Sequence, residues 1–333
     1  MITLERKIDF LSRADSYPES TTSVRRIETH MSYVFVTDHF AYKMKKPVKM
    51  PFLDFTDLAQ RKHYCEESLR LNRRLAATVY LGLIALTRGA DGTLCLGGTG
   101  EPVEWLEKMR RLSDELMLDR ALAEHRVSAA EVVRIAGVLI HFYERAEPAE
   151  TDTDAYRARL ERNVEDYWQS LDEPAYRLDT RLLDETLRAQ LRLLRTEPRL
   201  FDERVESGRV IEAHGDLRPE HVCLTPTPVI VDCLEFNREF RILDCVDELC
   251  FLALECELAG ESWVGDTLLC SYASQTGDRT PQRLRAFYKS HRAILRARLA
   301  AWHIQDHGPE EHPKWLARAT RYLEVAADHA RRF

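Results

Sequence analysis

The segment His214–Leu224, HGDLRPEHVCL, places carboxylate, guanidinium and imidazole side chains within a few positions of one another. Asp216 is followed by Arg218 and, five residues after the aspartate, by His221. Such groups exchange protons, bind anions or bind metal ions. Taken alone, however, a His-Gly-Asp triplet is more often a turn, and a lone histidine is more often structural than a metal ligand. The elements around the segment must decide between these alternatives.

A second acid follows this segment, at the end of a predicted hairpin. The apolar runs Val222–Leu224 and Val229–Val231 flank Thr-Pro-Thr-Pro, which is typical of a turn. The second run leads into Asp232, and Glu235 lies near enough to assist it. A strand that holds an acid rigidly suits Mg²⁺, because this hard cation prefers oxygen ligands. Taken alone, Asp232 could equally cap the end of a strand.

The first hundred residues are predicted to form mainly β-strands. Residues 32–48 contain two β-rich runs joined by Thr-Asp-His, and residues 82–96 contain two more around an Asp-Gly turn. Residues 102–112 contain a fifth extended segment that ends near Met109. These patterns indicate a sheet built from hairpins.

One of these strands and one helix carry candidate ligands. In FAYK, residues 40–43, Ala41 and Lys43 point to the same side of the strand. From residue 57 to about residue 75, apolar residues recur at helical spacing, which predicts a single helix in this region. Glu66 lies about 80–100° from the centre of the apolar stripe, at 100° per residue. The stripe consists of Leu58, Cys65, Leu69 and Ala76.

After residue 112 the chain is predicted to be almost wholly helical. Residues 128–131 fit a capping box, and the helix behind them is apolar nearly all round, which indicates that it is buried. Residues 147–206 are amphipathic and acidic, and residues 260–333 are helical and rich in arginine and alanine. The hairpin that precedes Asp232 is a short β island between these helical blocks.

Composition excludes several classes of protein. The net charge of −7 argues against general affinity for nucleic acid or an anionic membrane, since both favour a basic surface. No apolar stretch is long enough to span a bilayer, and the N-terminus is too evenly charged for a signal peptide. The eight cysteines form no CxxC pair, which predicts reduced, mostly buried thiols and a cytoplasmic location. No GxxxxGK[ST] motif is present, so no P-loop is expected.

Together, these motifs resemble the aminoglycoside phosphotransferase family, whose fold is protein-kinase-like. HGDLRPEH resembles the family's catalytic loop, in which His-Gly-Asp replaces the His-Arg-Asp of protein kinases. The resemblance implies a bilobal α+β fold. A small five-stranded antiparallel lobe with one helix, residues 1–110, would bind nucleotide, and a larger helical lobe, residues 111–333, would hold the catalytic loop 214–235 and a helical insert at 147–206.

The resemblance also implies roles for the catalytic loop. Asp216 would accept or orient the proton of a substrate hydroxyl as it attacks the γ-phosphate of ATP, and Arg218 would neutralise charge on the transferred group. Asp232, assisted by Glu235, would bind Mg²⁺. His221 takes the place of an asparagine that binds metal in kinases and most phosphotransferases. Imidazole suits Mg²⁺ less well, so His221 could mark a preference for Mn²⁺, or could instead hydrogen-bond Asp216 or a phosphate.

In the N-terminal lobe, the resemblance implies that Ala41 leaves space for adenine and that Lys43 reaches the α- and β-phosphates. Glu66 would pair with Lys43 from the helix. Ser32 and nearby backbone N–H groups would cover the phosphates in a loop without glycine. Asp247 would brace the catalytic loop. Adenine would bind at the hinge, to the backbone near Met109, Arg110 and Arg111.

Longer stretches agree with one subgroup of the family. Four segments resemble the phosphotransferase-like domain of certain bacterial proteins, in many of which it is fused to a C-terminal P-loop ATPase. The chain stops before any such domain, so a separate polypeptide could supply that partner. The resemblance covers roughly residues 5–300. The segments are IETHMSYVFVTDHFAYKMKKPV, FLDFTDLAQRKHYCEESLRLNRRLA, KMRRL and HGDLRPEHVCL.

We therefore expect a cytoplasmic phosphotransferase, dependent on ATP and Mg²⁺, that modifies a hydroxyl of a small molecule. The acceptor stays open between aminoglycosides, whose positive charge would suit the acidic residues 140–206, and sugars, amino alcohols or protein hydroxyls. The alternative is a pseudokinase, a nucleotide-binding regulatory module without turnover. His221 in the metal-binding position motivates that alternative.

Overall fold

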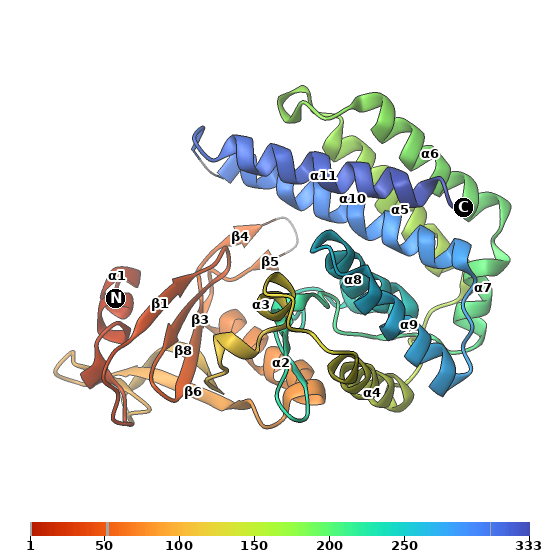
Figure 1. The fold of residues 1–333 in the computed structure, drawn as a ribbon. Coiled ribbons are helices and arrows are strands. Elements are labelled where there is room, and N and C mark those ends of the chain that lie inside the picture. Colours follow the sequence, from red (N-terminus) through yellow and green to blue (C-terminus); the bar gives the residue numbers. More distant parts are fainter. Residues whose placement is uncertain (1, 51–52, 307) are drawn as a thin grey trace. The chain divides into compact units, whose positions relative to one another are not determined.

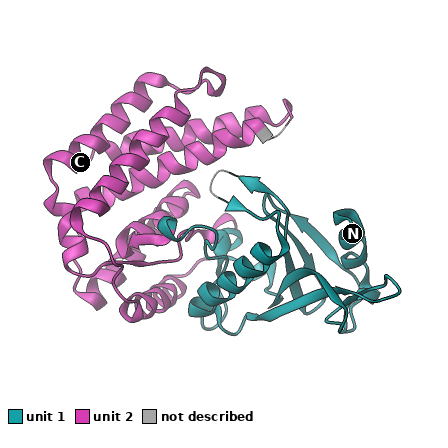
Figure 2. Cartoon of the chain, turned by 180° about the vertical axis from the view of Figure 1, so that it is seen from behind, with its two compact units in different colours: residues 1–121, 220–240 teal, residues 122–219, 241–333 magenta. Residues whose placement is uncertain are grey.

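The computed structural model describes residues 2–50, 53–306 and 308–333, and the chain divides into two compact units (Figure 2). Unit 1 comprises residues 1–121 and 220–240, and unit 2 comprises residues 122–219 and 241–333. The predicted catalytic loop is therefore divided after Pro219: its first part belongs to the helical unit, and its second part packs with the N-terminal sheet.

Unit 1 is built on an antiparallel sheet of six strands in the order β1-β2-β3-β8-β6-β7 (Figure 1). The predicted hairpins are confirmed as β2–β3 and β6–β7, but the expected number of five strands is wrong. The additional edge strand, β1, has the sequence RRIE and is exposed along its whole length. It lacks the apolar alternation by which strands are recognised. The strands are β1 (Arg25–Glu28), β2 (Ser32–Val36), β3 (Phe40–Lys45), β6 (Tyr80–Arg88), β7 (Leu94–Leu96) and β8 (Glu101–Arg110).

Two principal helices accompany this sheet. Helix α2 (Leu58–Ala76) is the predicted one, and the carboxylate of Asp57 caps it by accepting the N–H groups of Ala59 and Gln60. Helix α1 (Leu4–Leu11) was not predicted, although its buried Ile8 and Leu11 are spaced for one helical face. Shorter elements complete the unit: β4 (Lys49–Met50), β5 (Leu53–Asp54), most of α3 (Leu118–Ala123), β10 (Val222–Cys223) and β11 (Val229–Ile230).

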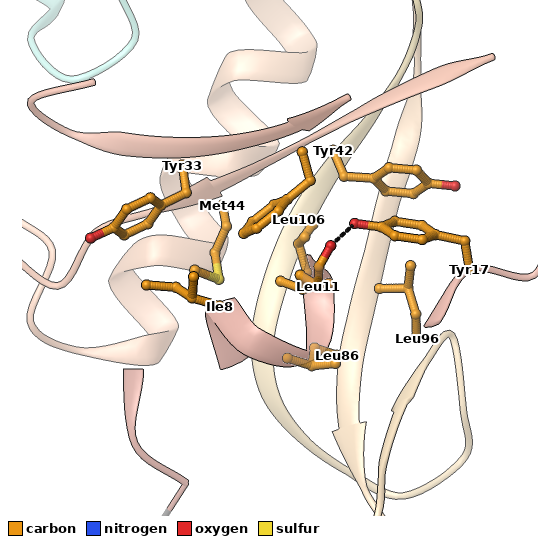
Figure 3. Close-up of a cluster of buried hydrophobic side chains, with 10 residues drawn as sticks. Ile8, Leu11, Tyr17, Tyr33, Tyr42, Met44, Leu86, Leu96 and Leu106 are labelled. Carbon is orange, nitrogen blue, oxygen red and sulfur yellow. Dashed lines mark hydrogen bonds between the residues drawn. The ribbon is translucent and has the colours of Figure 1, made fainter. Parts of the chain in front are cut away.

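The apolar core of unit 1 lies between the sheet and α1 (Figure 3). Tyr42 and Met44 of β3 are fully buried in it, and the Tyr17 hydroxyl donates a hydrogen bond to the carbonyl of Leu11. Because side chains alternate along a strand, Lys43 and Lys45 project from the other face of the sheet, toward α2. The face toward α1 is therefore apolar, whereas the face toward α2 carries buried charged groups beside a second apolar cluster.

Unit 2 is almost entirely helical. The capping box at Ser128 and Glu131 is present at the start of α4. Helix α8 is buried on nearly all sides and packs against α9 and α10, and α10 packs along α11 (Figure 1). The helices are α4 (Ala129–Arg145), α5 (Thr153–Leu171), α6 (Thr180–Thr196), α7 (Arg199–Glu206), α8 (Cys245–Leu258), α9 (Ser262–Thr276), α10 (Gln282–Asp306) and α11 (His312–Ala330), and the strands β9 (Val210–Glu212) and β12 (Ile242–Asp244) pair antiparallel.

Two expectations from composition can be compared with the structure. All eight cysteines are free thiols, and six of them are buried, as expected. Among the described residues, no helix combines the length and the apolar character needed to cross a membrane.

Candidate functional site

Lys43 and Asp232 meet in unit 1, although they are 189 residues apart in the sequence. The Lys43 ammonium donates to Asp232 Oδ1 at 2.5 Å. Burial lowers the pKa of Lys43, but Asp232 and then Glu235 and Glu107 outweigh it and hold that pKa well above its ordinary value. The lysine is therefore charged, and it faces the acid that follows the β10–β11 hairpin. The structure thus brings together two of the residues that the sequence nominated.

Asp232 is held in an unusual backbone conformation. Its φ is +64°, in the left-handed region, which an aspartate tolerates better than most side chains. Its N–H donates to the hydroxyl of Tyr80 at 3.0 Å, and its carboxylate stays 47% exposed. His221 Nε2 lies 3.8 Å from Asp232 Oδ2, and the backbone carbonyl of His221 accepts the N–H of Val231. The backbone thus aims a solvent-accessible carboxylate beside an imidazole.

The second lysine on this face of β3 has different partners. Lys45 is fully buried and forms ion pairs with Glu107, at 3.4 Å, and with Glu235. Burial lowers the pKa of Lys45, but Glu235 and Glu107 outweigh this and raise it above its ordinary value. Glu235 was predicted to assist a metal ion. The structure instead directs its carboxylate to Lys45, with 8% of the side chain exposed.

The prediction that Glu66 pairs with Lys43 is not supported. Glu66 is 54% exposed and lies 3.6 Å from Lys62, one helical turn earlier. Helix α2 instead turns Cys65, Ser68 and Asn72 inward. Ser68 donates to Glu107 Oε2 at 2.7 Å, so β8 supplies the buried acid on this face of the sheet and α2 supplies a hydroxyl.

The predicted adenine contacts meet a mixed outcome. Ala41 lies opposite Met109 in the β3–β8 pairing, and Met109 packs on an apolar cluster that includes Val231. The N–H groups of Arg110 and Arg111 already donate, to the carbonyls of Val79 and His39. Those two donors are therefore committed within the fold. The cluster consists of Leu69, Ala76, Val79 and Tyr80, with Leu83, Met109, Leu112, Val229 and Val231 against it.

Ser32 does not lie as the prediction required. It begins strand β2 with 2% of its surface exposed, and its N–H donates to the Thr29 hydroxyl at 3.0 Å. That hydroxyl donates in turn to the Ser32 carbonyl. Thr29 and Ser32 thus close this turn between themselves, and the Ser32 N–H is engaged within it.

In unit 2, one buried acid holds the residues of the predicted catalytic loop. Glu248 Oε1 accepts the N–H groups of both His214, at 2.7 Å, and Gly215, at 2.8 Å. Its other oxygen accepts the hydroxyl of Tyr143, and burial raises the pKa of Glu248. Gly215 has a φ of +89°, a conformation that favours glycine. Glu248 therefore fixes the backbone turn that leads into Asp216.

Asp247, predicted to brace the loop, is instead the partner of Arg292. The Arg292 guanidinium donates to both Asp247 oxygens at 2.7 Å, and the pair is buried. Burial raises the pKa of Asp247 even though the guanidinium lowers it. The brace is the neighbouring residue, Glu248. Sequence analysis pointed to this stretch of helix but selected the wrong acid in it.

Asp216 and Arg218 form a two-pronged ion pair. Arg218 donates from Nε to Oδ1 and from a terminal nitrogen to Oδ2, each at 2.9 Å. The Asp216 N–H donates to His214 Nδ1 at 3.2 Å. The side chain of Asp216 is 29% exposed and that of Arg218 is 16% exposed. Arg218 is thus oriented by the acid that it was predicted to assist.

The residues present are compatible with a nucleotide-bound Mg²⁺ but not with a metal centre made by protein alone. Within residues 2–50, 53–306 and 308–333, no three His, Cys, Asp or Glu side chains gather as a metal-binding group. Mg²⁺ at phosphates commonly uses only one or two carboxylates of the protein. The exposed Asp232 carboxylate fits that requirement, and the buried Glu235 does not.

Comparisons with known protein sequences give relatives without an assigned function. No family model matches the chain. Uncharacterized proteins of Mycobacterium tuberculosis and Mycobacterium bovis are each 31% identical over 312 residues, which is 91% of this chain and 59% of the relative. The chain thus spans about three-fifths of the length of the curated relatives that it matches.

Solved structures with a similar fold are small-molecule kinases. A choline/ethanolamine kinase family protein from Mesorhizobium loti has a TM-score of 0.54 at 12% identity and covers 98% of this chain and 99% of its own. Choline kinase from Cryptosporidium parvum has a TM-score of 0.55 at 12% identity, over 96% and 94%. An aminoglycoside phosphotransferase from Streptomyces rimosus, in complex with ADP and streptomycin, has a TM-score of 0.51 at 15% identity, over 89% and 99%. The fold is therefore protein-kinase-like.

Proposed function

We propose that the protein is an ATP- and Mg²⁺-dependent phosphotransferase that transfers the γ-phosphate to a hydroxyl of a small molecule. The contact between Lys43 and Asp232 is the observation that carries this proposal. It joins a charged lysine of the central sheet to an exposed carboxylate behind the β10–β11 hairpin. Phosphoryl transfer needs both groups, one for the nucleotide phosphates and one for their cation.

The unit 1 residues would bind the nucleotide. Lys43 would donate to the α- and β-phosphates, and Asp232 would hold the Mg²⁺ ion, beside His221. When bound, this ion neutralises charge on the phosphate oxygens. The apolar cluster around Met109 would contact the adenine ring, with Ala41 leaving space beside it.

The unit 2 residues would act on the acceptor. Asp216 would take up or orient the proton of the attacking hydroxyl, and Arg218 would place positive charge near the transferred group. Glu248 supports this role because it fixes the backbone on which Asp216 stands. A misplaced base loses rate without losing nucleotide affinity.

Two variants separate these roles. Asp232→Asn should weaken binding of Mg²⁺-nucleotide in calorimetry, because the ion loses a carboxylate ligand. Asp216→Asn should keep nucleotide affinity and lose most turnover with any accepted hydroxyl, because the base acts on the acceptor. No binding of Mg²⁺-ATP by the wild-type protein at millimolar concentration would refute the proposal.

A nucleotide-binding module without turnover is the second candidate, and one observation favours it. Both oxygens of Asp216 accept hydrogen bonds from Arg218, so the carboxylate is engaged in this structure. His221 in place of an asparagine points the same way. This candidate predicts nucleotide binding without consumption of ATP against a broad metabolite library. Asp216→Asn would then leave every function of the protein unchanged.

The acceptor is better sought in a screen than among aminoglycosides alone. Residues 140–206 are acidic, but many of these acids form ion pairs with arginines of the same segment. Such pairing leaves less charge for a polycation. Examples are Arg157 with Asp154 and Asp202, Arg195 with Glu161 and Glu165, and Arg199 with Glu203 and Glu206. A cytoplasmic location and a separate P-loop ATPase partner are parts of the same proposal, and co-purification from the native source tests the partner.

A further inference from the structure

The segment that carries Asp232 is fastened at each end by a side chain from a different element. The N–H of Cys233 donates to Asn72 Oδ1 of α2 at 2.9 Å. Two residues later, Glu235 pairs with Lys45 of β3. Asn72 and Lys45 are both fully buried, and Cys233 is 1% exposed. These contacts hold residues 233 and 235 to the buried side, while the Asp232 side chain stays 47% exposed.

The two fastenings belong to one buried network. Asn72 Nδ2 donates to the Ser68 carbonyl at 2.9 Å and to the Ser68 hydroxyl at 3.2 Å. Ser68 donates to Glu107, and Glu107 lies 3.4 Å from Lys45. The contacts therefore run from Cys233 through α2 and β8 to Lys45, and from Lys45 back to Glu235 in the same segment as Cys233. A network of this kind resists displacement of one member, because an unpaired buried polar group is costly.

We propose that Asn72 and Lys45 are positioning residues that keep Asp232 in place when Lys43 exchanges partners. This inference rests on the proposed function. In this structure Lys43 binds Asp232. Nucleotide binding would turn Lys43 toward phosphate and Asp232 toward the cation. Asp232 then loses its own ion pair, and the fastenings at Cys233 and Glu235 hold its position.

Lys43 and Lys45, two positions apart on β3, would then have different roles. Both project from the α2 side of β3, but Lys45 is fully buried and Lys43 retains 14% exposure. Lys45 anchors the segment through Glu235, and Lys43 is left for a ligand. Helix α2 acts through an amide and not through the carboxylate of Glu66, which points to solvent.

Asn72→Ala tests this proposal by removing the acceptor of the Cys233 N–H. The measurement is the affinity for the non-hydrolysable nucleotide AMP-PNP, by calorimetry, with excess MgCl₂ and with EDTA. We expect the Mg²⁺-dependent gain in affinity to fall at least about fivefold, and the affinity in EDTA to stay within about twofold, since one buried hydrogen bond to the segment is lost. Asn72→Asp keeps an acceptor oxygen but sets its second oxygen against the Ser68 carbonyl, so it should restore only part of the gain.

Lys7→Met is the matched control for lost stability. Lys7 is a buried lysine of unit 1 that pairs with Glu104, outside this network. Its variant should unfold more easily but keep the wild-type ratio of the two affinities. An unchanged ratio in Asn72→Ala, or an equal fall in Lys7→Met, would overturn the inference.

Hydrogen exchange in the nucleotide-free protein gives a readout independent of binding. In Asn72→Ala, a peptide covering residues 232–235 should exchange faster, while the peptide covering β2 stays as in wild type. Unchanged protection of 232–235 would overturn the positioning role even if nucleotide binding is normal. If wild-type protein binds no nucleotide, the proposed function fails, and this inference fails with it.

Discussion

Lys45→Met should destabilise the protein far more than Lys43→Met, although the two lysines lie on the same face of one strand. Lys45 is fully buried against two carboxylates, of which Glu107 is 0% and Glu235 8% exposed. Methionine fills a similar volume but removes the cation that contacts both acids. Lys43 pairs with Asp232, which is 47% exposed and can be solvated when the lysine is removed.

The magnitudes follow from this difference in burial. Removing one partner of a buried ion pair costs about 3–5 kcal/mol, because the remaining charge is uncompensated. At about 2 °C per kcal/mol for a chain of this size, Lys45→Met should lower Tm by roughly 6–10 °C. An exposed partner makes the pair worth about 0–1 kcal/mol, so Lys43→Met should lower Tm by less than about 2 °C.

Thermal unfolding without nucleotide, followed by circular dichroism, measures the contrast. The Lys45→Met deficit in Tm should narrow as the pH is lowered, because buried carboxylates that have lost the charge of Lys45 bind protons more readily than in the unfolded chain. Adding Glu107→Gln and Glu235→Gln to Lys45→Met should recover more than half of the loss. Equal Tm values for the two lysine variants, or a larger loss in Lys43→Met, would refute the reasoning.

Three further predictions concern histidines and the loop brace. Glu248→Ala should cost at least about 3 kcal/mol in urea unfolding, because the Gly215 N–H and two other donors lose their acceptor, whereas Glu248→Gln should cost much less. His221→Asn should keep or raise Mg²⁺-supported turnover, and wild type should gain more from Mn²⁺; a variant inactive with both ions would contradict this. Burial lowers the pKa of His291 to about 3 from 6.5, so wild-type stability should fall between those pH values as the unfolded chain takes up a proton that the folded chain refuses. His291→Gln should remove that slope, of at most about 1.4 kcal/mol per pH unit, and parallel curves would contradict the assignment.

Local patterns in the sequence were sufficient for most elements of the fold. The hairpins β2–β3 and β6–β7, helix α2 and the capping box of α4 are confirmed, because each depends on residues that are close together in the chain. The strand Arg25–Glu28 and helix Leu4–Leu11 were missed. The first is exposed throughout, so no apolar alternation marks it, and the second is only eight residues long, with an apolar face that packs against Tyr17 and the sheet.

For the candidate site, the sequence could nominate residues but could not assign their partners. Strand alternation placed Lys43 and Lys45 on one face, and the helical wheel placed Glu66 at the side of an apolar stripe. Neither pattern states how far α2 is rotated relative to the sheet. The rotation found turns Ser68 and Asn72 inward and leaves Glu66 in solvent.

Local periodicity in the sequence sets which way each side chain leaves its own helix or strand, but the partner of each side chain depends on how those elements pack. Lys43 finds its acid 189 residues later and Lys45 finds Glu235 190 residues later, so neither pair leaves a local signal. Asp247 and Glu248 are adjacent, but they differ by about 100° around α8. Only the packing of α8 directs Glu248 to the backbone of His214 and Gly215 and Asp247 to Arg292, because that packing sets which neighbour lies in each direction.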